Sequence, residues 1–391
     1  MLDTNKLKII ELPNVSDTGL KNITMGVRTI INTQSRGNRF KKYTTKKLDE
    51  AWQHTNDFEK FIMMFLSEVK TFSTPQAQML FTLPYQKETI AYSGYISELQ
   101  KRYNTKIDSK KLFTTYSENM VYNKLDKLKK KNLIDSIRFR ANNIDIDREE
   151  APSLMLVHFF LTEFGTQVLA RGTGINKNDI GFVPNYKIYS FNSLLHLSEC
   201  NDFFISTINA FQDITNNHPE VGILDVVRWD NEKDSTHNFE YNRTDKTVFK
   251  PDGHMIIFSS KVGGFVPFYL EHDVGDSTKQ KISHKATSYI KFVIYKKEVE
   301  GKSFKKPILL FVTTSDSKVR LHEKSITNAV KKEFSKQLDY LNNFGRIAIT
   351  TSRLIKEYSP TGEIWRLIDL ETGEVLPSRY NLLSLTWNKE D

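Results

Sequence analysis

The spacing of apolar residues changes about halfway along this chain of 391 residues. In the first half they recur every three to four positions, as in Phe58, Phe61, Ile62 and Phe65, which predicts amphipathic helices with one buried stripe. Beyond about residue 220 they come in short runs typical of strands, with a few helical segments between them. This change restricts the chain to an α+β or α/β architecture, with a helical domain before a mixed-sheet domain.

The same spacing predicts the individual elements. We expect helices over 57–70, from 73, over 95–103, from 117, near 162–171, and over 191–215, 279–295 and 324–343. We expect a two-stranded ribbon between 134 and 161, and strands over 222–229, 248–258, 265–271, 308–313, 347–351 and 365–369, the last paired near 375.

Composition narrows the class of protein. Hydrophobic residues make up 39% and charged residues 26% of the chain, as in a globular protein that is neither disordered nor embedded in a membrane. No apolar run approaches the ~18–20 residues that span a bilayer, and the first residues lack the pattern of a signal peptide. We therefore expect a cytoplasmic protein without a membrane partner. The single cysteine, Cys200, excludes an internal disulfide framework and a cysteine-based zinc site.

Positive charge is concentrated in the first half of the chain. The net charge is +9, and residues 95–140 hold twelve basic and five acidic residues, a surplus of seven. Three helices followed by a two-stranded ribbon is the layout of a winged helix, a helix-turn-helix domain whose third helix enters the major groove of DNA. A solvated helix face, with lysines placed favourably for the helix dipole, is the alternative explanation of this lysine run.

The predicted recognition helix and ribbon carry the candidate DNA contacts. We assign phosphate contacts to Lys124, Lys127, Lys129, Lys130, Lys131, Arg138 and Arg140. Tyr122 and Asn123 are the candidates for contacts with base edges. Double-stranded DNA is therefore the expected partner, bound mainly through its phosphates.

Three carboxylates fall where predicted strands begin or end. Asp252 falls at the start of one strand, and Glu271 and Asp273 lie at the end of the next. Residues two apart on a strand share a face, so Glu271 and Asp273 can both meet Asp252 across the sheet. Converging carboxylate oxygens suit Mg²⁺ or Mn²⁺, and we predict these three residues as metal ligands. Surface ion pairs and helix caps are the alternative roles for such acids.

The order of these acids resembles the core of the PD-(D/E)xK nucleases, in which an Asp on one strand precedes an acid-x-Lys pair on the next. Asp273 stands where that pattern has its lysine. In such folds a basic residue of the following helix can take the place of the lysine, and Lys285 and Lys281, one turn apart, are the candidates here.

Four segments in order resemble a known family: Ser117–Ile134, Phe160–Ala170, Asn201–Asp202 and Leu270–Tyr289. Together they resemble the bacterial replication-relaxation family, which is associated with plasmid replication and DNA relaxation. The resemblance implies a winged helix followed by a restriction-endonuclease-like domain, and catalytic roles for Asp252, Glu271, Asp273, Lys285 and Tyr289. Val274 and Asp276 stand where the family has a basic residue and a threonine.

Other side chains near the acids have less specific explanations. A tyrosine that attacks DNA covalently is conceivable, with Tyr289 first among the candidates, but packing is the commoner role of a tyrosine. His254 should share a face with Asp252, whereas His272 should point away from Glu271. Cys200 should be buried and inert.

Four segments follow from these patterns. We predict a basic, partly ordered arm over 1–56, a winged-helix domain over 57–171, a linker over 172–189 and a restriction-endonuclease-like domain over 190–391.

The predicted function is that of a plasmid or mobile-element protein. We expect it to bind duplex DNA at a plasmid origin and to nick or relax it with Mg²⁺ or Mn²⁺, alongside replication or transfer proteins. The alternatives are a non-catalytic replication initiator and a transcriptional regulator with a degenerate nuclease-like domain.

Overall fold

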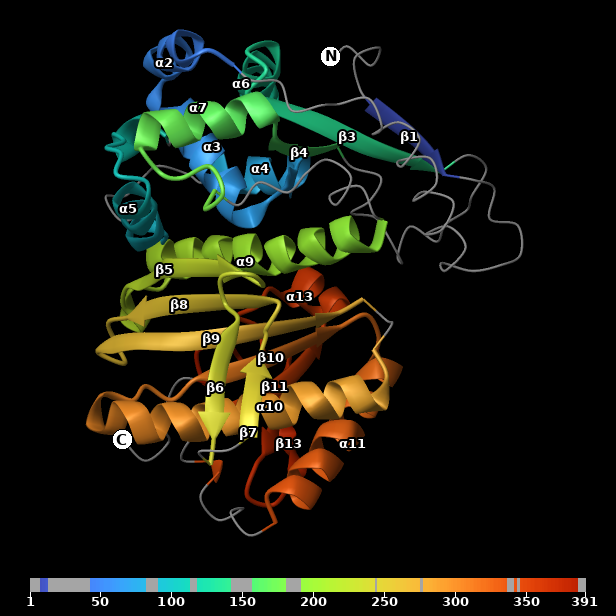
Figure 1. Ribbon diagram of the computed structural model, residues 1–391. Coiled ribbons are helices and arrows are strands. Elements are labelled where there is room, and N and C mark those ends of the chain that lie inside the picture. The colour runs from blue at the N-terminus through green and yellow to red at the C-terminus, as the bar shows by residue number, and fades with distance from the viewer. Residues whose placement is uncertain are drawn as a thin grey trace. The chain divides into compact units, whose positions relative to one another are not determined.

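The computed structural model describes residues 8–12, 43–81, 91–112, 118–141, 157–180, 191–242, 245–274, 277–335, 341–342 and 345–385 (Figure 1). These residues pack as two compact units. The first comprises the described parts of 1–88 and 96–205, and the second those of 89–95 and 206–391. The division falls inside one long helix, α9 (Phe191–Asn217), whose first part belongs to the first unit.

The first unit is mainly helical. Its helices are α2 (Thr45–Gln53), α3 (Asp57–Val69), α4 (Thr74–Phe81), α5 (Ser93–Arg102, of which the first turn belongs to the second unit), α6 (Glu118–Lys130) and α7 (Glu163–Thr173), with a 3₁₀ turn at Ser109–Lys111. Helix α3 begins at a reciprocal cap in which the Asn56 side chain accepts from the Glu59 amide and the Glu59 carboxylate accepts from the Asn56 amide. Its apolar stripe, which includes Phe61 and Phe65, is fully buried.

A small sheet completes the first unit. Its strands are β1 (Lys8–Leu12), β2 (Phe72–Ser73), β3 (Ile134–Ala141) and β4 (Val157–Leu161), in the order β1-β3-β4-β2. Strand β4 runs antiparallel to both β3 and β2, whereas β1 is parallel to β3. The strand between α3 and α4 is thereby joined to the ribbon that follows α6.

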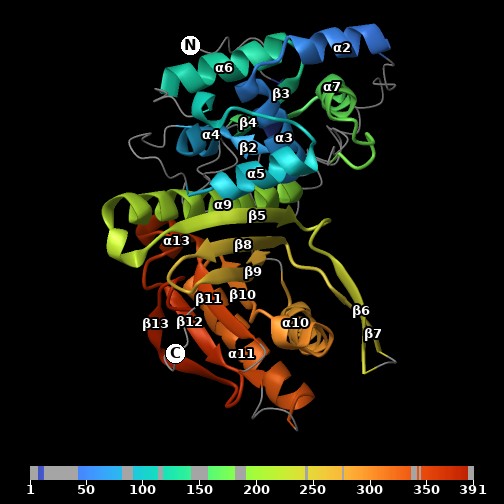
Figure 2. The ribbon, with the colours of Figure 1, turned by 90° about the vertical axis from the view of Figure 1, so that its left-hand side faces the viewer.

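The second unit is built on a seven-stranded mixed sheet in the order β13-β12-β11-β10-β9-β8-β5 (Figure 2). Its strands are β5 (Leu224–Asn231), β8 (Gly253–Ser259), β9 (Gly264–Asp273), β10 (Ile308–Thr313), β11 (Arg346–Thr351), β12 (Trp365–Asp369) and β13 (Glu374–Tyr380). The three central strands β9, β10 and β11 are parallel, and the outer neighbours are antiparallel. A separate hairpin, β6 (His237–Tyr241) and β7 (Asp245–Phe249), is inserted between β5 and β8.

Two helices cover one face of this sheet. Helices α10 (Lys279–Glu300) and α11 (Asp316–Glu333) form a core with β9, β10 and β11 in which Tyr269, Ile290, Phe311, Ile326 and Ile349 are buried. The short helix α13 (Ser352–Tyr358) follows β11, and its Ser352 contacts His272 on the opposite face. Two 3₁₀ turns, Pro219–Val221 and Gly301–Ser303, lie outside these layers.

The structure confirms the mixed α+β character and most predicted elements, with several differences. Strands β1 and β2 and helices α2 and α13 are elements that the sequence did not predict. Helix α11 begins at 316, eight residues before the predicted start, and leaves Thr313 at the end of β10 only a short turn away. The strand predicted over 248–258 is two strands, because Pro251 lacks the N–H that a continuous ladder requires. Strand β6 was not predicted.

The predicted arm and the predicted linker both lie partly outside the described residues. The 1–56 arm contains β1 and α2, and the remaining residues up to 42 lie outside the described part. Within the predicted linker, 172–180 holds the end of α7 and a turn, and 181–189 lies outside the described part. Cys200 is buried, as predicted.

Gly253, at the start of β8, fits against a tryptophan. A Cβ there would lie 2.5 Å from the nearest ring atom of the buried Trp229, whereas a Cβ at Gly264 would meet nothing nearer than 3.9 Å. We therefore expect Gly253→Ala to lower the free energy of unfolding by about 1–3 kcal/mol and Gly264→Ala to change it by less than about 0.5 kcal/mol. Chemical denaturation measures both, and equal effects would contradict the packing argument.

Candidate functional site

Two of the predicted carboxylates meet one lysine on the face covered by α10. Lys285 donates to the Glu271 carboxylate, and its Nζ lies 3.5 Å from Asp252 Oδ2. Asp252 is fixed by the backbone of β9: its amide donates to the Leu270 carbonyl at 2.8 Å, and the His272 amide donates to its Oδ2 at 2.7 Å. The structure therefore brings Asp252, Glu271 and Lys285 together, and we call them the carboxylate–lysine cluster.

The two carboxylates of this cluster are buried, whereas 34% of the Lys285 side chain is exposed. Only 2% of Glu271 is exposed, and its Oε1 has no hydrogen-bond partner among the residues that the structure describes. Burial raises the pKa of Glu271 well above its usual value, and the charge of Asp252 raises it further, whereas Lys285 opposes both. For Lys285 itself, burial acts to lower the pKa, but the two carboxylates outweigh burial and hold the pKa above its ordinary value. The lysine is therefore charged near neutral pH.

The third predicted carboxylate has a different neighbour. Asp273 Oδ2 lies 3.3 Å from Nε2 of His322, on α11, and Oδ1 accepts from the Ser277 amide at 3.1 Å. Burial lowers the pKa of the His322 imidazole, although the charge of Asp273 acts in the opposite direction. His322 was not predicted from the sequence, since the helix that carries it was expected to begin two residues later.

The side chains of the cluster suit a divalent cation in part. Mg²⁺ is usually held by one or two carboxylates together with waters and substrate phosphates, and Asp252 and Glu271 offer two buried carboxylates around one cationic group. Within the described ranges, no three His, Cys, Asp or Glu side chains form a group that could hold a metal ion. Metal binding by Asp252, Glu271 and Asp273 stays a prediction.

Tyr289 occupies a different part of the same helix. Its hydroxyl lies 2.8 Å from the Pro307 carbonyl and 3.1 Å from that of Arg346, beside the first residues of β10 and β11. The side chain is fully buried in the core, and burial raises its pKa well above the usual value. The hydroxyl therefore contacts the backbone at the start of β10 and β11. Asp273 lies at the other end of these strands, because its register partner is Thr313, the last residue of β10.

A histidine–aspartate pair joins the neighbouring strands β8 and β5. His254 Nδ1 lies 3.1 Å from Asp230 Oδ2, to which Arg228 also donates at 2.6 Å, and the His254 ring stacks on Tyr269 at 4.6 Å. Burial acts to raise the pKa of Asp230, but the hydrogen bonds from His254 and Arg228 outweigh it and lower the pKa to about 2. The predicted orientation is confirmed: His254 shares the face of Tyr269, whereas His272 lies against Ser352 on the opposite face.

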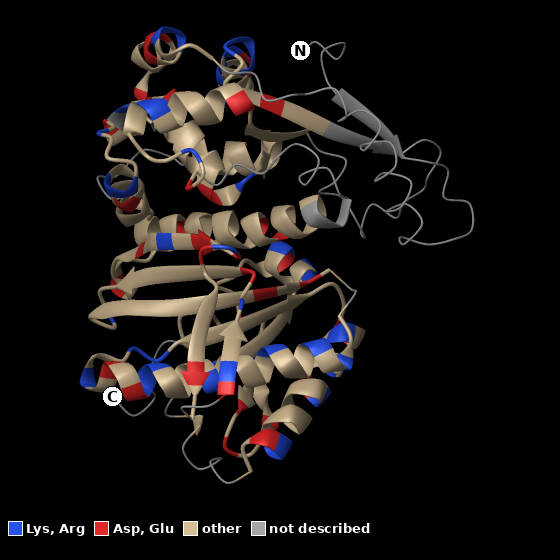
Figure 3. Ribbon diagram, in the orientation of Figure 1, with Lys and Arg blue, Asp and Glu red and all other residues tan. Residues whose placement is uncertain are grey.

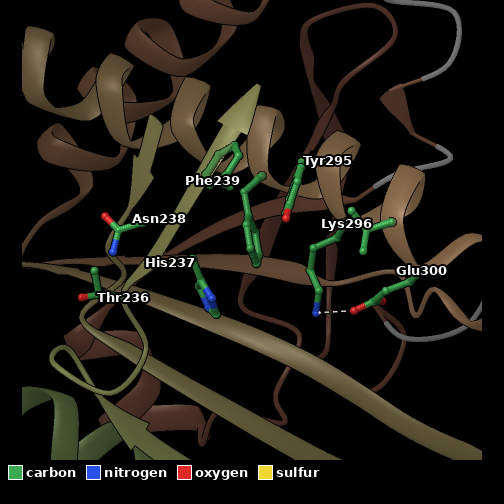
Figure 4. Close-up of a pocket in the computed structure, with 9 residues that line it drawn as sticks. Thr236, His237, Asn238, Phe239, Tyr295, Lys296 and Glu300 are labelled. Carbon is green, nitrogen blue, oxygen red and sulfur yellow. Dashed lines mark ion pairs between the residues drawn. The ribbon is translucent and has the colours of Figure 1, made fainter. Parts of the chain in front are cut away.

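A hollow of about 430 Å³ lies between β6 and the end of α10 (Figure 4). Its walls combine aromatic rings, among them His237, Phe239 and Tyr295, with the ion pair between Lys296 and Glu300 at 3.0 Å. Burial lowers the pKa of His237 to about 4, so this ring is neutral near pH 7. The hollow contains none of the predicted site residues.

Helix α6 carries several of the basic residues of the first unit (Figure 3), and some of the lysines predicted to bind DNA hold this unit together. Lys131 Nζ lies 2.7 Å from both carboxylate oxygens of Glu59, the capping residue of α3, and 3.0 Å from the His54 carbonyl. Lys129 Nζ donates to Ser136 Oγ on β3 at 2.7 Å. These two lysines connect α6 with α3 and with the ribbon.

The remaining candidates on α6 are more accessible. Lys127 is exposed, and Lys130 pairs with Asp126 at 2.7 Å, one turn earlier, with 71% of the lysine side chain exposed. Lys124 Nζ lies 4.4 Å above the Phe58 ring. An exposed pair such as Lys130–Asp126 contributes little to stability, so Lys130 can exchange its partner for a phosphate.

The structure describes only some of the other side chains that were predicted to contact DNA. Asn123 is exposed on α6 and Tyr122 is half-buried. Arg138 and Arg140 lie on β3, and their side chains are outside the described part of the structure.

Comparison with known families identifies the chain. The model of the replication-relaxation family matches residues 105–304, half of the chain, including α6, the carboxylate–lysine cluster and Tyr289. The chain belongs to the replication-relaxation family. Comparisons with curated proteins and with solved structures give no match. None of the helices that the structure describes is both long and apolar enough to cross a lipid bilayer.

Asn201 and Asp202, which belong to the segments that resemble the family, have structural roles in the first unit. The Asn201 amide on α9 donates to the carbonyls of Val69 and Thr71, at 3.2 and 2.6 Å. Gln76 on α4 donates to the Asp202 carboxylate at 2.6 Å. These contacts fix the first part of α9 to the turn between α3 and α4.

Replacing Lys285 by methionine leaves two buried carboxylates without their cation. The pKa of Glu271, already raised in the folded state, rises further, so the folded state binds more protons than the unfolded state above the unfolded pKa. Stability is then lost as the pH rises. We expect Lys285→Met to lower the free energy of unfolding by about 2–3 kcal/mol at pH 8 and by less at pH 5.

The matched control for Lys285→Met is Lys281→Met, which removes an exposed lysine one turn earlier on α10. Urea unfolding at both pH values measures the two variants. A loss of the same size at pH 5 and pH 8 would show that Lys285 acts through packing alone.

Proposed function

We propose that this protein binds plasmid DNA through a winged helix in its first unit and cleaves one DNA strand with a divalent cation held by Asp252 and Glu271. The family points to a role in plasmid replication and DNA relaxation. The observation that carries the proposal of cleavage is the buried carboxylate–lysine cluster, in which one lysine contacts two carboxylates and Glu271 Oε1 has no described hydrogen-bond partner.

The order of elements in the first unit supports the winged helix. Helices α3, α4 and α6, with α5 between the last two, precede the β3–β4 ribbon, and β2, between α3 and α4, pairs with β4. In such domains the last of the three helices enters the major groove and the ribbon lies along the phosphates. Helix α6 carries basic residues in its last turn, and Lys127 and Asn123 are exposed on it.

The arrangement of the second unit supports cleavage. Asp252, just before β8, and Glu271, on the adjacent strand β9, face one cationic group, and Lys285 supplies the positive charge that the PD-(D/E)xK pattern has at the position of Asp273. A divalent cation bound by these carboxylates would supply positive charge to a phosphoryl oxygen and lower the pKa of a water. Lys285 would stabilise negative charge that develops on the phosphate.

The carboxylates should be essential if the protein cleaves DNA. We expect Asp252→Asn and Glu271→Gln each to slow the conversion of supercoiled plasmid to open circles by roughly 100-fold or more, the scale for loss of one group that stabilises transition-state charge. Agarose gels measure this conversion in Mg²⁺ or Mn²⁺, with a protease step that reveals any protein linked to DNA through Tyr289.

The control for these variants is Asp245→Asn, which removes a carboxylate of β7 that pairs with Lys291 of α10 outside the cluster. Nicking by Asp252→Asn at the parental rate would rule out the proposed metal site.

The lysines of α6 should set the salt dependence of DNA binding. We expect Lys127→Ala and Lys130→Ala each to weaken duplex binding and to reduce the slope of log K against log[salt] by about 1, because each removes one phosphate contact. Fluorescence anisotropy at several salt concentrations measures this slope. Lys302→Ala, which removes an exposed lysine of the second unit, is the control, and an equal effect there would indicate nonspecific charge.

A non-catalytic replication initiator is the second candidate. It is favoured by Lys285, which compensates the charge of the two carboxylates without a metal ion. In that case the carboxylate variants lose stability and keep DNA binding, and the parental protein leaves supercoiled plasmid intact.

A further inference from the structure

A buried carboxylate and a buried imidazole face each other where β9 ends. Asp273 Oδ2 and His322 Nε2 lie 3.3 Å apart, and the side chains are 4% and 1% exposed. Asp273 is the last residue of β9, and His322 lies on α11. Lys285, by contrast, contacts Asp252 and Glu271.

The hydrogen bonding of His322 assigns its proton. Nδ1 lies 2.8 Å from the Lys318 carbonyl, and because a carbonyl oxygen can only accept, Nδ1 carries the hydrogen. In the neutral ring, Nε2 then presents its lone pair to the Asp273 carboxylate. A histidine that binds a metal through one nitrogen commonly donates its other N–H to a backbone carbonyl in this way.

A threonine adds a third candidate ligand atom on the same face. Thr313 pairs with Asp273 in the parallel register of β10 and β9, so the two side chains lie next to each other. Thr313 is fully buried, and its Oγ1 has no hydrogen-bond partner in the described part of the chain. The His322 ring lies 5.7 Å from Phe311, two residues before Thr313 and on the same face.

We propose that Asp273 Oδ2, His322 Nε2 and Thr313 Oγ1 bind a divalent transition-metal ion. Two ligand atoms each about 2.1 Å from one metal lie about 3.0–3.4 Å apart at the usual bond angles. The observed separation of Asp273 Oδ2 and His322 Nε2 falls in this range. The imidazole nitrogen favours Fe²⁺, Co²⁺ or Zn²⁺ over Mg²⁺.

This site is distinct from the cation position proposed for Asp252 and Glu271, and its occupancy does not depend on DNA cleavage. In this site Asp273, which stands at the lysine position of the PD-(D/E)xK pattern, would bind a metal ion together with His322 and Thr313. Asp273 and Glu271 lie two residues apart on one face of β9, so the two cation positions would be neighbours.

Cobalt serves as the probe because its visible absorption reports the ligands directly. We expect the full-length protein to bind one Co²⁺ in this site with visible absorption bands, and His322→Gln to weaken that binding by roughly 10-fold or more. Thr313→Val keeps the shape of the side chain and should weaken binding to a smaller extent. His284→Gln, which removes an exposed histidine of α10, is the control and should bind as the parent does.

Three results would overturn the proposal: no Co²⁺ binding by the parental protein, unchanged affinity and absorption in His322→Gln, or loss of the bands in Asp252→Asn. If His322→Gln does not fold, pulsed EPR of the parental Co²⁺ complex decides, since absence of nitrogen coupling excludes an imidazole ligand. Asp252→Asn that stops nicking but keeps the bands supports both proposals. Bands in a parental protein that does not nick DNA support this site alone.

Discussion

The arrangement of the second unit depends on the contacts of the Lys285 ammonium group with Asp252 and Glu271. Without it, Asp252 and Glu271 would place two carboxylates in a buried space on the face that α10 covers. The lysine extends from α10 to strand β9 and to the residue before β8, so the same contact that balances the charge also positions the helix over the sheet. Removal of the lysine would leave buried carboxylates without a cationic partner, which is strongly destabilising.

The lysines of α6 show how charge counting and structure differ. The sequence indicates a block of positive charge, and all five lysines from 124 to 131 are candidates for phosphate contacts. In the structure, Lys131 and Lys129 hydrogen-bond to α3 and to β3, and Lys124 lies over a phenylalanine ring. Part of the surplus charge therefore assembles the first unit, and the more accessible part, Lys127 and Lys130, is what a nucleic acid can reach.

Much of the fold could be predicted because it depends on local patterns. The period of apolar residues located α3, α6, α9 and β10 within a few residues, and strand alternation placed Asp252 and Glu271 on one face. The start of α11 could not be found in this way, because Ser315 at its N-cap makes no side-chain cap and the first turn is polar. The pairing of His322 with Asp273 joins residues 49 positions apart and depends on that start.

Pro251 has a consequence for how this site can change. It separates β7 from β8, and Asp252, which follows it, is held by backbone hydrogen bonds to Leu270 and His272 rather than by a ladder of its own strand. The His272 amide would donate to the side-chain oxygen of an asparagine in almost the same place. A single substitution can therefore remove the negative charge at this position and leave the architecture around it intact.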